Sequence, residues 1–113
     1  MLTSMSVAEK KLGILLSTHP SQPAFHRGVE AAASALAAGG QVYLYCIDEA
    51  VRGVSDPQIQ SLRERGLILY ACAYAAQRRS LPVDDLAVYA GLGVLGDLLA
   101  GTDEFLGFNK EAE

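Results

Sequence analysis

The sequence has few of the residues from which several kinds of small protein are built. Its 113 residues include two cysteines, Cys46 and Cys72, and two histidines, His19 and His26. Two cysteines without Cys-x-x-Cys spacing are too few for a disulfide scaffold. Together with the two scattered histidines they form no recognisable zinc-binding pattern. The sequence therefore indicates neither a disulfide-stabilised domain nor a zinc site.

Basic residues and long apolar runs are also scarce. Nine basic residues stand against thirteen acidic ones, for a net charge of −4, whereas nucleic-acid binders normally show a basic excess or stripe. No apolar run approaches the roughly 20 residues needed to cross a bilayer. Residues 1–9 lack the charged start and the long apolar core of a secretory signal. We therefore expect a cytoplasmic protein that binds neither nucleic acid nor membranes.

The overall composition is that of a folded domain. Hydrophobic residues make up 50% of the chain and charged residues 19%, which is unlike a disordered or fibrous protein. The length suits one domain with a single core. We expect a flexible N-terminal segment at residues 1–10, one domain at residues 11–108 and a charged tail at residues 109–113.

Short apolar runs alternate with helical patterns along this domain. The runs predict five strands, at residues 11–17, 41–47, 67–71, 86–89 and 104–108. Helical spacing of apolar residues predicts helices between them. Parallel strands need crossover connections, which are usually helices. The pattern therefore predicts an α/β fold, a three-layer α/β/α sandwich around a small, mainly parallel five-stranded sheet.

Several residues mark the ends of these helices. Ser21 is expected to cap the helix that begins near Pro23, and Asp56 to cap the second helix. Gly39 and Gly40 are expected to end the first helix, because glycine accepts a left-handed cap. The last helix, at residues 92–99, aligns its leucines at positions 92, 95 and 99.

Cys72 stands where the strand at residues 67–71 gives way to a helix. Ligand sites in open α/β sheets lie outside the carboxyl ends of the strands. The unpaired N–H groups of a helix start favour an anion there, and such surroundings can lower a cysteine pKa from about 8.5 to roughly 3.5–7.5. This placement predicts a reactive thiolate. The pattern also allows a buried, inert cysteine, because apolar neighbours raise the pKa.

Three further residues are candidates for a supporting role. His19 follows the first strand and would reach the same sheet edge as Cys72, where it could help to activate the thiol. The alternative is a solvent-exposed loop histidine. Cys46 ends the second strand, either as a second thiol near the site or as a core residue. Arg78, with Arg79, could attract acidic partners or anionic sulfur species, or could simply be a solvated helix end.

Two motif matches carry little weight. Gly91 to Gly96 fit G-x-G-x-x-G, but at the fourth strand–helix junction, with too little chain following for the acidic ribose ligand of a dinucleotide site. We expect these glycines to allow close packing of helix on sheet. Cys72 and Arg78 fit the Cys-x5-Arg spacing of phosphatase loops. The residues between them favour a continuous helix over an anion-binding loop, so a thiol hydrolase or phosphatase is a minor alternative.

The order of these elements, with the cysteine where it is, resembles the DsrE/DsrF-like sulfur-relay family, including its TusD-type subunits. The resemblance depends most on residues 67–81, with their strand, cysteine, small residues and Arg-Arg-x-Leu exit, and it extends from about residue 11 to residue 108. Ser80 stands where the family usually has glycine, which suits a left-handed helix cap better than serine does.

The resemblance implies a small sulfur carrier or sulfurtransferase that works without metal or organic cofactor. The Cys72 thiolate would take a persulfide sulfur from a donor protein and pass it to an acceptor protein. It also implies assembly into homo-oligomers, trimers or hexamers. The alternative is a non-catalytic oligomeric module that binds a small ligand or a protein partner, with Cys72 merely packed.

Overall fold

The computed structural model describes residues 10–109. The flexible segment expected at residues 1–10 and the tail expected at residues 109–113 therefore lie almost entirely outside the described residues. In chain order the elements are β1 (Lys11–Leu16), α1 (Pro23–Ala37), β2 (Gln41–Cys46), the 3-10 helix η2 (Asp48–Gly53), α2 (Pro57–Glu64), β3 (Ile68–Cys72), α3 (Ala73–Arg78), β4 (Val88–Ala90), α4 (Leu92–Gly101) and β5 (Glu104–Phe108).

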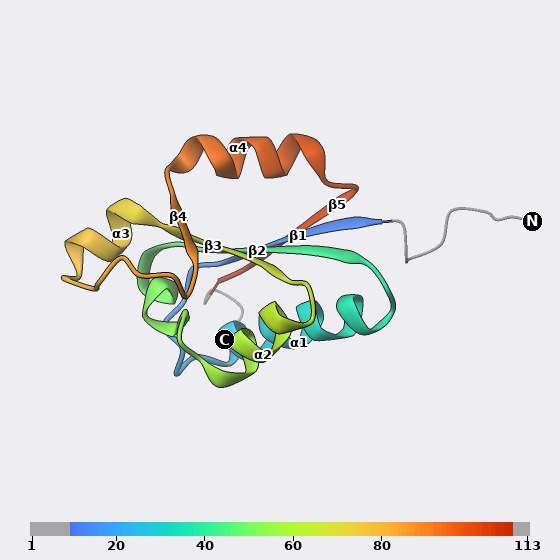
Figure 1. Cartoon of the computed structure of the whole chain (residues 1–113), viewed down its shortest axis with the longest axis horizontal. Coiled ribbons are helices and arrows are strands. Elements are labelled where there is room, and N and C mark those ends of the chain that lie inside the picture. The colour runs from blue at the N-terminus through green and yellow to red at the C-terminus, as the bar shows by residue number, and fades with distance from the viewer. Residues whose placement is uncertain (1–9, 110–113) are drawn as a thin grey trace, which may run out of the picture.

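The five strands form one sheet in the order β4-β3-β2-β1-β5, and every neighbouring pair is parallel. In Figure 1, α4 covers one side of the sheet, and α1 and α2 cover the other. The predicted three-layer α/β/α sandwich is therefore confirmed. Because all strands run the same way, the segments that follow β1, β2 and β3 emerge at the same edge of the sheet.

The core lies mainly between the sheet and α1. Ile14, Leu16 and Leu44 are fully buried there. Gly28 of α1 lets the helix approach the sheet closely, since a Cβ at this position would collide with the Leu16 side chain. Within residues 10–109, no helix has both the length and the apolar character needed to span a bilayer.

Two of the predicted helix ends are confirmed by the structure and one is wrong. The carboxylate of Asp56 accepts hydrogen bonds from the N–H groups of Gln58 and Ile59, at 2.8 and 3.3 Å, as a cap should. Gly39 has φ +94° just beyond the end of α1. The expected Ser21 cap is wrong, because Gln22 occupies the cap position of α1 and the Ser21 hydroxyl contacts His19 instead.

Helix α4 differs from expectation in how it packs. Leu98 is its buried residue, whereas Leu92 and Leu99 are 60% and 55% exposed. A Cβ added at Gly91, Gly93 or Gly96 would meet no atom within 4 Å. The idea that these glycines serve close helix–sheet packing is therefore wrong.

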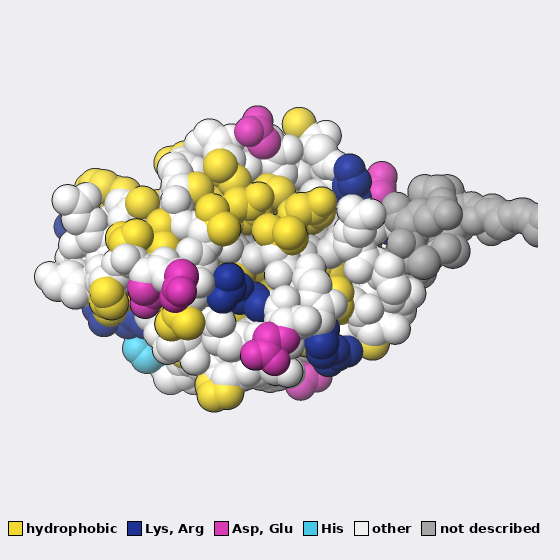
Figure 2. Space-filling model, in the orientation of Figure 1, with side chains coloured by type: hydrophobic (Ala, Val, Ile, Leu, Met, Phe, Trp, Pro, Cys, Tyr) yellow, Lys and Arg dark blue, Asp and Glu magenta, His cyan; other side chains and the backbone are white. Residues whose placement is uncertain are grey.

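An apolar surface results between α4 and the β4 edge of the sheet. Figure 2 shows hydrophobic side chains gathered below α4 on this face of the molecule. The exposed large hydrophobic residues of the elements that meet there are Ile68, Val88, Leu92 and Leu99. We refer to these four residues as the apolar surface.

Candidate thiol site

A pocket of about 590 Å³ lies at the carboxyl edge of the sheet, where η2, α3 and the start of α4 meet. Cys72 borders it at the junction of β3 and α3. The charged residues of its wall come from η2 and α3 and are Asp48, Glu49, Arg78 and Arg79. A thiol and four charged groups therefore line one pocket, because the segments that follow parallel strands lie at the same edge of the sheet.

Cys72 is both the last residue of β3 and the N-cap of α3. Its Sγ accepts a hydrogen bond from the N–H of Ala75 at 3.4 Å. Only 4% of the residue is exposed. The thiol therefore forms part of the pocket wall, reached through the pocket and held by a backbone donor.

Tyr45 lies beside this thiol, and the sequence reading missed it. Its ring is fully buried, and its hydroxyl donates to the carbonyl oxygens of Gly91 and Ala90, at 3.1 and 3.3 Å. Burial, followed by the electrostatic interaction and hydrogen bonding with the Cys72 side chain, raises the pKa of Tyr45 to about 12. Tyr45 is therefore a protonated hydroxyl next to the Cys72 sulfur.

The register of the sheet explains why Tyr45 and Cys72 meet. Tyr45 pairs with Tyr70 across β2 and β3, and the two rings stack with centroids 6.3 Å apart. Tyr70 is two residues before Cys72, and alternate residues of a strand share a face. The apolar and aromatic run at residues 42–47 indicated a buried strand that contains Tyr45. Which side chain of this strand lies beside Cys72 depends on the strand register, and the sequence alone does not give that register.

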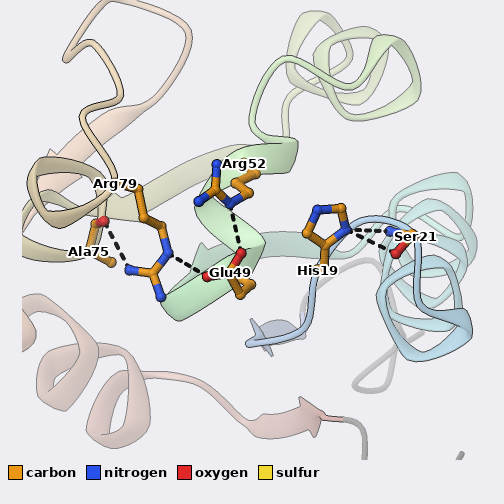
Figure 3. Close-up of polar contacts among 6 residues, drawn as sticks. All are labelled: His19, Ser21, Glu49, Arg52, Ala75 and Arg79. Carbon is orange, nitrogen blue, oxygen red and sulfur yellow. Dashed lines mark hydrogen bonds and ion pairs between the residues drawn. The ribbon is translucent and has the colours of Figure 1, made fainter.

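Glu49 is held between two arginines at the rim of the pocket (Figure 3). The Nε atoms of Arg52 and Arg79 lie 2.7 and 2.8 Å from its two carboxylate oxygens. The hydrogen bonds with Arg52 and then Arg79 lower the pKa of Glu49. Arg79 also donates to the carbonyl of Ala75, so its guanidinium ties α3 to η2.

Arg78 is held differently. Its guanidinium lies 5.7 Å from the centroid of the Tyr74 ring and donates to the Tyr74 hydroxyl at 3.1 Å. Among the described residues no carboxylate forms an ion pair with Arg78. The structure thus brings Cys72 and Arg78 to the same pocket, with Arg78 able to receive an anion.

The other two candidates lie elsewhere. His19 borders a separate pocket of about 320 Å³, which shares only Glu49 with the first, and its Nδ1 accepts a hydrogen bond from the N–H of Ser21 at 3.0 Å. Cys46 is fully buried, and burial raises its pKa to about 12. Because Cys46 follows Tyr45, it faces the opposite side of the sheet. Cys46 is a core residue, and a role for His19 in activating the thiol stays a prediction.

The Cys-x5-Arg match does not form an anion-binding loop. Residues Ala73–Arg78 form a continuous helix between Cys72 and the end of the Cys-x5-Arg match. The backbone therefore does not curl into the nest that a phosphate would need. Within residues 10–109, no group of three or more His, Cys, Asp or Glu side chains is arranged to hold a metal ion.

The fold and the pocket together define a small all-parallel α/β sandwich with the Cys72 thiol in a pocket at the carboxyl edge of its sheet. The YchN protein of E. coli, known from a crystal structure, has this fold. The two superpose with a TM-score of 0.67 over 88% of this chain and 99% of YchN, at 16% sequence identity. This likeness is one of architecture. No protein-family model and no curated protein matches the sequence.

Proposed function

We propose that this protein is a cytoplasmic sulfur carrier of the DsrE-like kind, in which Cys72 holds a persulfide. One observation carries the proposal: the Cys72 sulfur borders an open pocket at the carboxyl end of β3 and accepts a backbone hydrogen bond there. The sequence resemblance to the sulfur-relay family and the fold shared with YchN support it. The other cysteine, Cys46, is shut in the core.

The chemistry requires two thiol exchanges and no cofactor. The Cys72 thiolate attacks the outer sulfur of a donor persulfide, R–S–SH. A bond forms between the Cys72 sulfur and that outer sulfur, the donor S–S bond breaks, and the donor leaves as the thiolate R–S⁻. An acceptor thiolate then attacks the outer sulfur of Cys72–S–SH and restores the Cys72 thiolate. No net oxidation occurs, since the sulfane sulfur only changes carrier.

Arg78 gives this site a preference for negative charge. Glu49 is paired with Arg52 and Arg79, whereas Arg78 lies against the Tyr74 ring and donates to its hydroxyl and forms no ion pair with a carboxylate of residues 10–109. A guanidinium recognises carboxylates and similar anions well. We therefore expect anionic persulfides or acidic partner segments to approach Cys72 past Arg78.

Mass spectrometry after incubation with polysulfide tests the proposal. Wild-type protein should gain about 32 Da, the mass of one sulfur atom added as a persulfide. The Cys46→Ser variant should gain the same mass and Cys72→Ser should not. Absence of the adduct from the wild type would contradict the proposal.

A second candidate is a non-catalytic oligomeric module that binds a small ligand or a protein partner. The observation in its favour is that only 4% of Cys72 is exposed. Alkylation by iodoacetamide separates the two. Labelling of Cys72 well below pH 8 supports the carrier, whereas labelling no faster than that of a free cysteine supports the module.

The partners implied by the resemblance are part of the proposal. They are further copies of this chain, in a trimer or hexamer, and a donor and an acceptor protein for the sulfur. The apolar surface supports self-association, because exposed apolar side chains gathered on one face commonly mark a protein–protein contact.

A further inference from the structure

The Cys72 thiolate needs hydrogen-bond donors because it is almost entirely buried. With 4% of the residue exposed, water can provide little solvation, and a buried charge without donors is strongly disfavoured. The N–H of Ala75 supplies one bond at 3.4 Å. That bond comes from the first turn of a six-residue helix. Because it is a single, long hydrogen bond, a second donor would contribute substantially to ionisation of the Cys72 thiol.

Tyr45 is placed to be that donor. Its hydroxyl reaches the carbonyl oxygens of Ala90 and Gly91. Ala90 is the residue that pairs with Cys72 across β3 and β4, so the hydroxyl lies at the strand end where the sulfur lies. The fully buried ring packs against Tyr70. Because this packing holds the rigid ring, it also holds the hydroxyl at a fixed position.

The hydroxyl keeps its proton over the range in which a thiol ionises. The pKa of Tyr45 is raised to about 12, well above that of an ordinary cysteine, about 8.5. The charged groups at the pocket come from η2 and α3 and are Asp48, Glu49, Arg78 and Arg79. Strand β2 contributes Tyr45, and α3 also contributes the Tyr74 phenol, which is bound by Arg78.

We propose that Tyr45 is a positioning residue whose hydroxyl donates to the Cys72 sulfur when that sulfur is a thiolate or carries a persulfide. In the thiol form the hydroxyl donates to the Gly91 and Ala90 carbonyls. On ionisation the thiol proton leaves to solvent and the hydroxyl proton turns toward Sγ, so no covalent bond of Tyr45 changes. The inference rests on the proposed function, in which this thiolate is the working group.

Tyr45→Phe tests the inference, since it removes the hydroxyl and keeps the ring. In a Cys46→Ser background, the rate of Cys72 alkylation by iodoacetamide is measured from pH 5 to pH 10. The midpoint should rise by about one pH unit, as expected for loss of a hydrogen bond to a charged group. At pH values well below the wild-type midpoint the rate should fall about three- to tenfold, while the limiting rate at high pH should not fall, because a less acidic thiolate is at least as nucleophilic.

Tyr70→Phe is the matched control, because it removes a neighbouring phenol from the same stack and should leave the midpoint unchanged. An unchanged midpoint in Tyr45→Phe would overturn the inference. So would a fall in the limiting rate without a shift of midpoint, since that is the signature of a structural role. Circular dichroism confirms that each variant is folded. A shifted midpoint in a protein that takes up no sulfur from polysulfide would refute the carrier function and leave the role of Tyr45 in ionisation standing.

Discussion

The Nε atom of Arg79 lies 2.8 Å from a carboxylate oxygen of Glu49, and this ion pair joins α3 to η2 at the rim of the Cys72 pocket. Because hydrogen bonds lower the pKa of Glu49 in the folded protein, its ionised form favours folding at pH values above the unfolded pKa. That contribution is lost as the pH falls through the folded pKa. The pair therefore predicts a stability difference that depends on pH.

Glu49→Gln should lower the midpoint of thermal unfolding at neutral pH by a small amount, because the carboxylate is partly exposed and screened by solvent. The difference from wild type should begin to shrink as the pH falls below the unfolded glutamate pKa, about 4.3, and should be lost as the pH falls through the lower pKa of Glu49 in the folded protein. Thermal scans from pH 3 to pH 8 check this. A difference that stays constant over that range would show that the charge of Glu49 does not contribute.

Ser80→Gly should stabilise the protein. Ser80 has φ +55° at the end of α3, where the N–H of Leu81 reaches back to the carbonyl of Ala76 at 2.9 Å. A side chain in this left-handed conformation is strained and glycine is not, so the expected gain is about 0.5–1 kcal/mol. Urea unfolding measures it.

Ser80→Ala is the control for that prediction. Alanine keeps the Cβ, so it should give no comparable gain. Equal stability of the glycine and alanine variants would show that backbone strain at Ser80 is not the cause.

Arg78→Ala should change the charge preference of Cys72 alkylation. The guanidinium should favour anionic iodoacetate relative to neutral iodoacetamide, and its removal should lower the iodoacetate-to-iodoacetamide rate ratio by about two- to fivefold at low salt. Arg63→Ala, on α2 across the sheet, should leave the ratio unchanged. An unaltered ratio in Arg78→Ala would remove Arg78 from the proposed recognition of anions.

Val88→Asp should weaken self-association. Val88 is 52% exposed within the apolar surface, and a charge there would have to be desolvated in an interface. Light scattering should give a larger mass for the wild type than for this variant. Val83→Asp, which alters a loop residue that is 65% exposed, should keep the wild-type mass. A monomeric wild-type protein would contradict the proposed assembly.

Much of the fold follows from local sequence signals. β5 occupies residues 104–108 as predicted, and Asp56 caps α2 as predicted, because an apolar run and a cap each act over a few residues. The position of Cys72 between β3 and α3 could also be predicted, since apolar residues that favour strands are followed there by alanine-rich residues that favour a helix.

The features that could not be predicted from the sequence depend on contacts between segments that are far apart in the chain. Tyr45 lies beside Cys72 only because β2 and β3 pair in one register, and a shift by one residue would turn its ring to the other face. The packing of α4 through Leu98, with Leu92 and Leu99 exposed, is likewise set by the tertiary structure. The Ser21 hydroxyl contacts His19 and does not cap α1.

The central claim is that Cys72 carries sulfur that can be passed on, and cyanolysis tests it most directly. Cyanide removes sulfane sulfur from a persulfide as thiocyanate, which can be quantified by colour. Protein loaded with polysulfide and freed of excess reagent should release about one thiocyanate per chain in the wild type and in Cys46→Ser. Release from Cys72→Ser equal to that from the wild type, or none from either, would contradict the account.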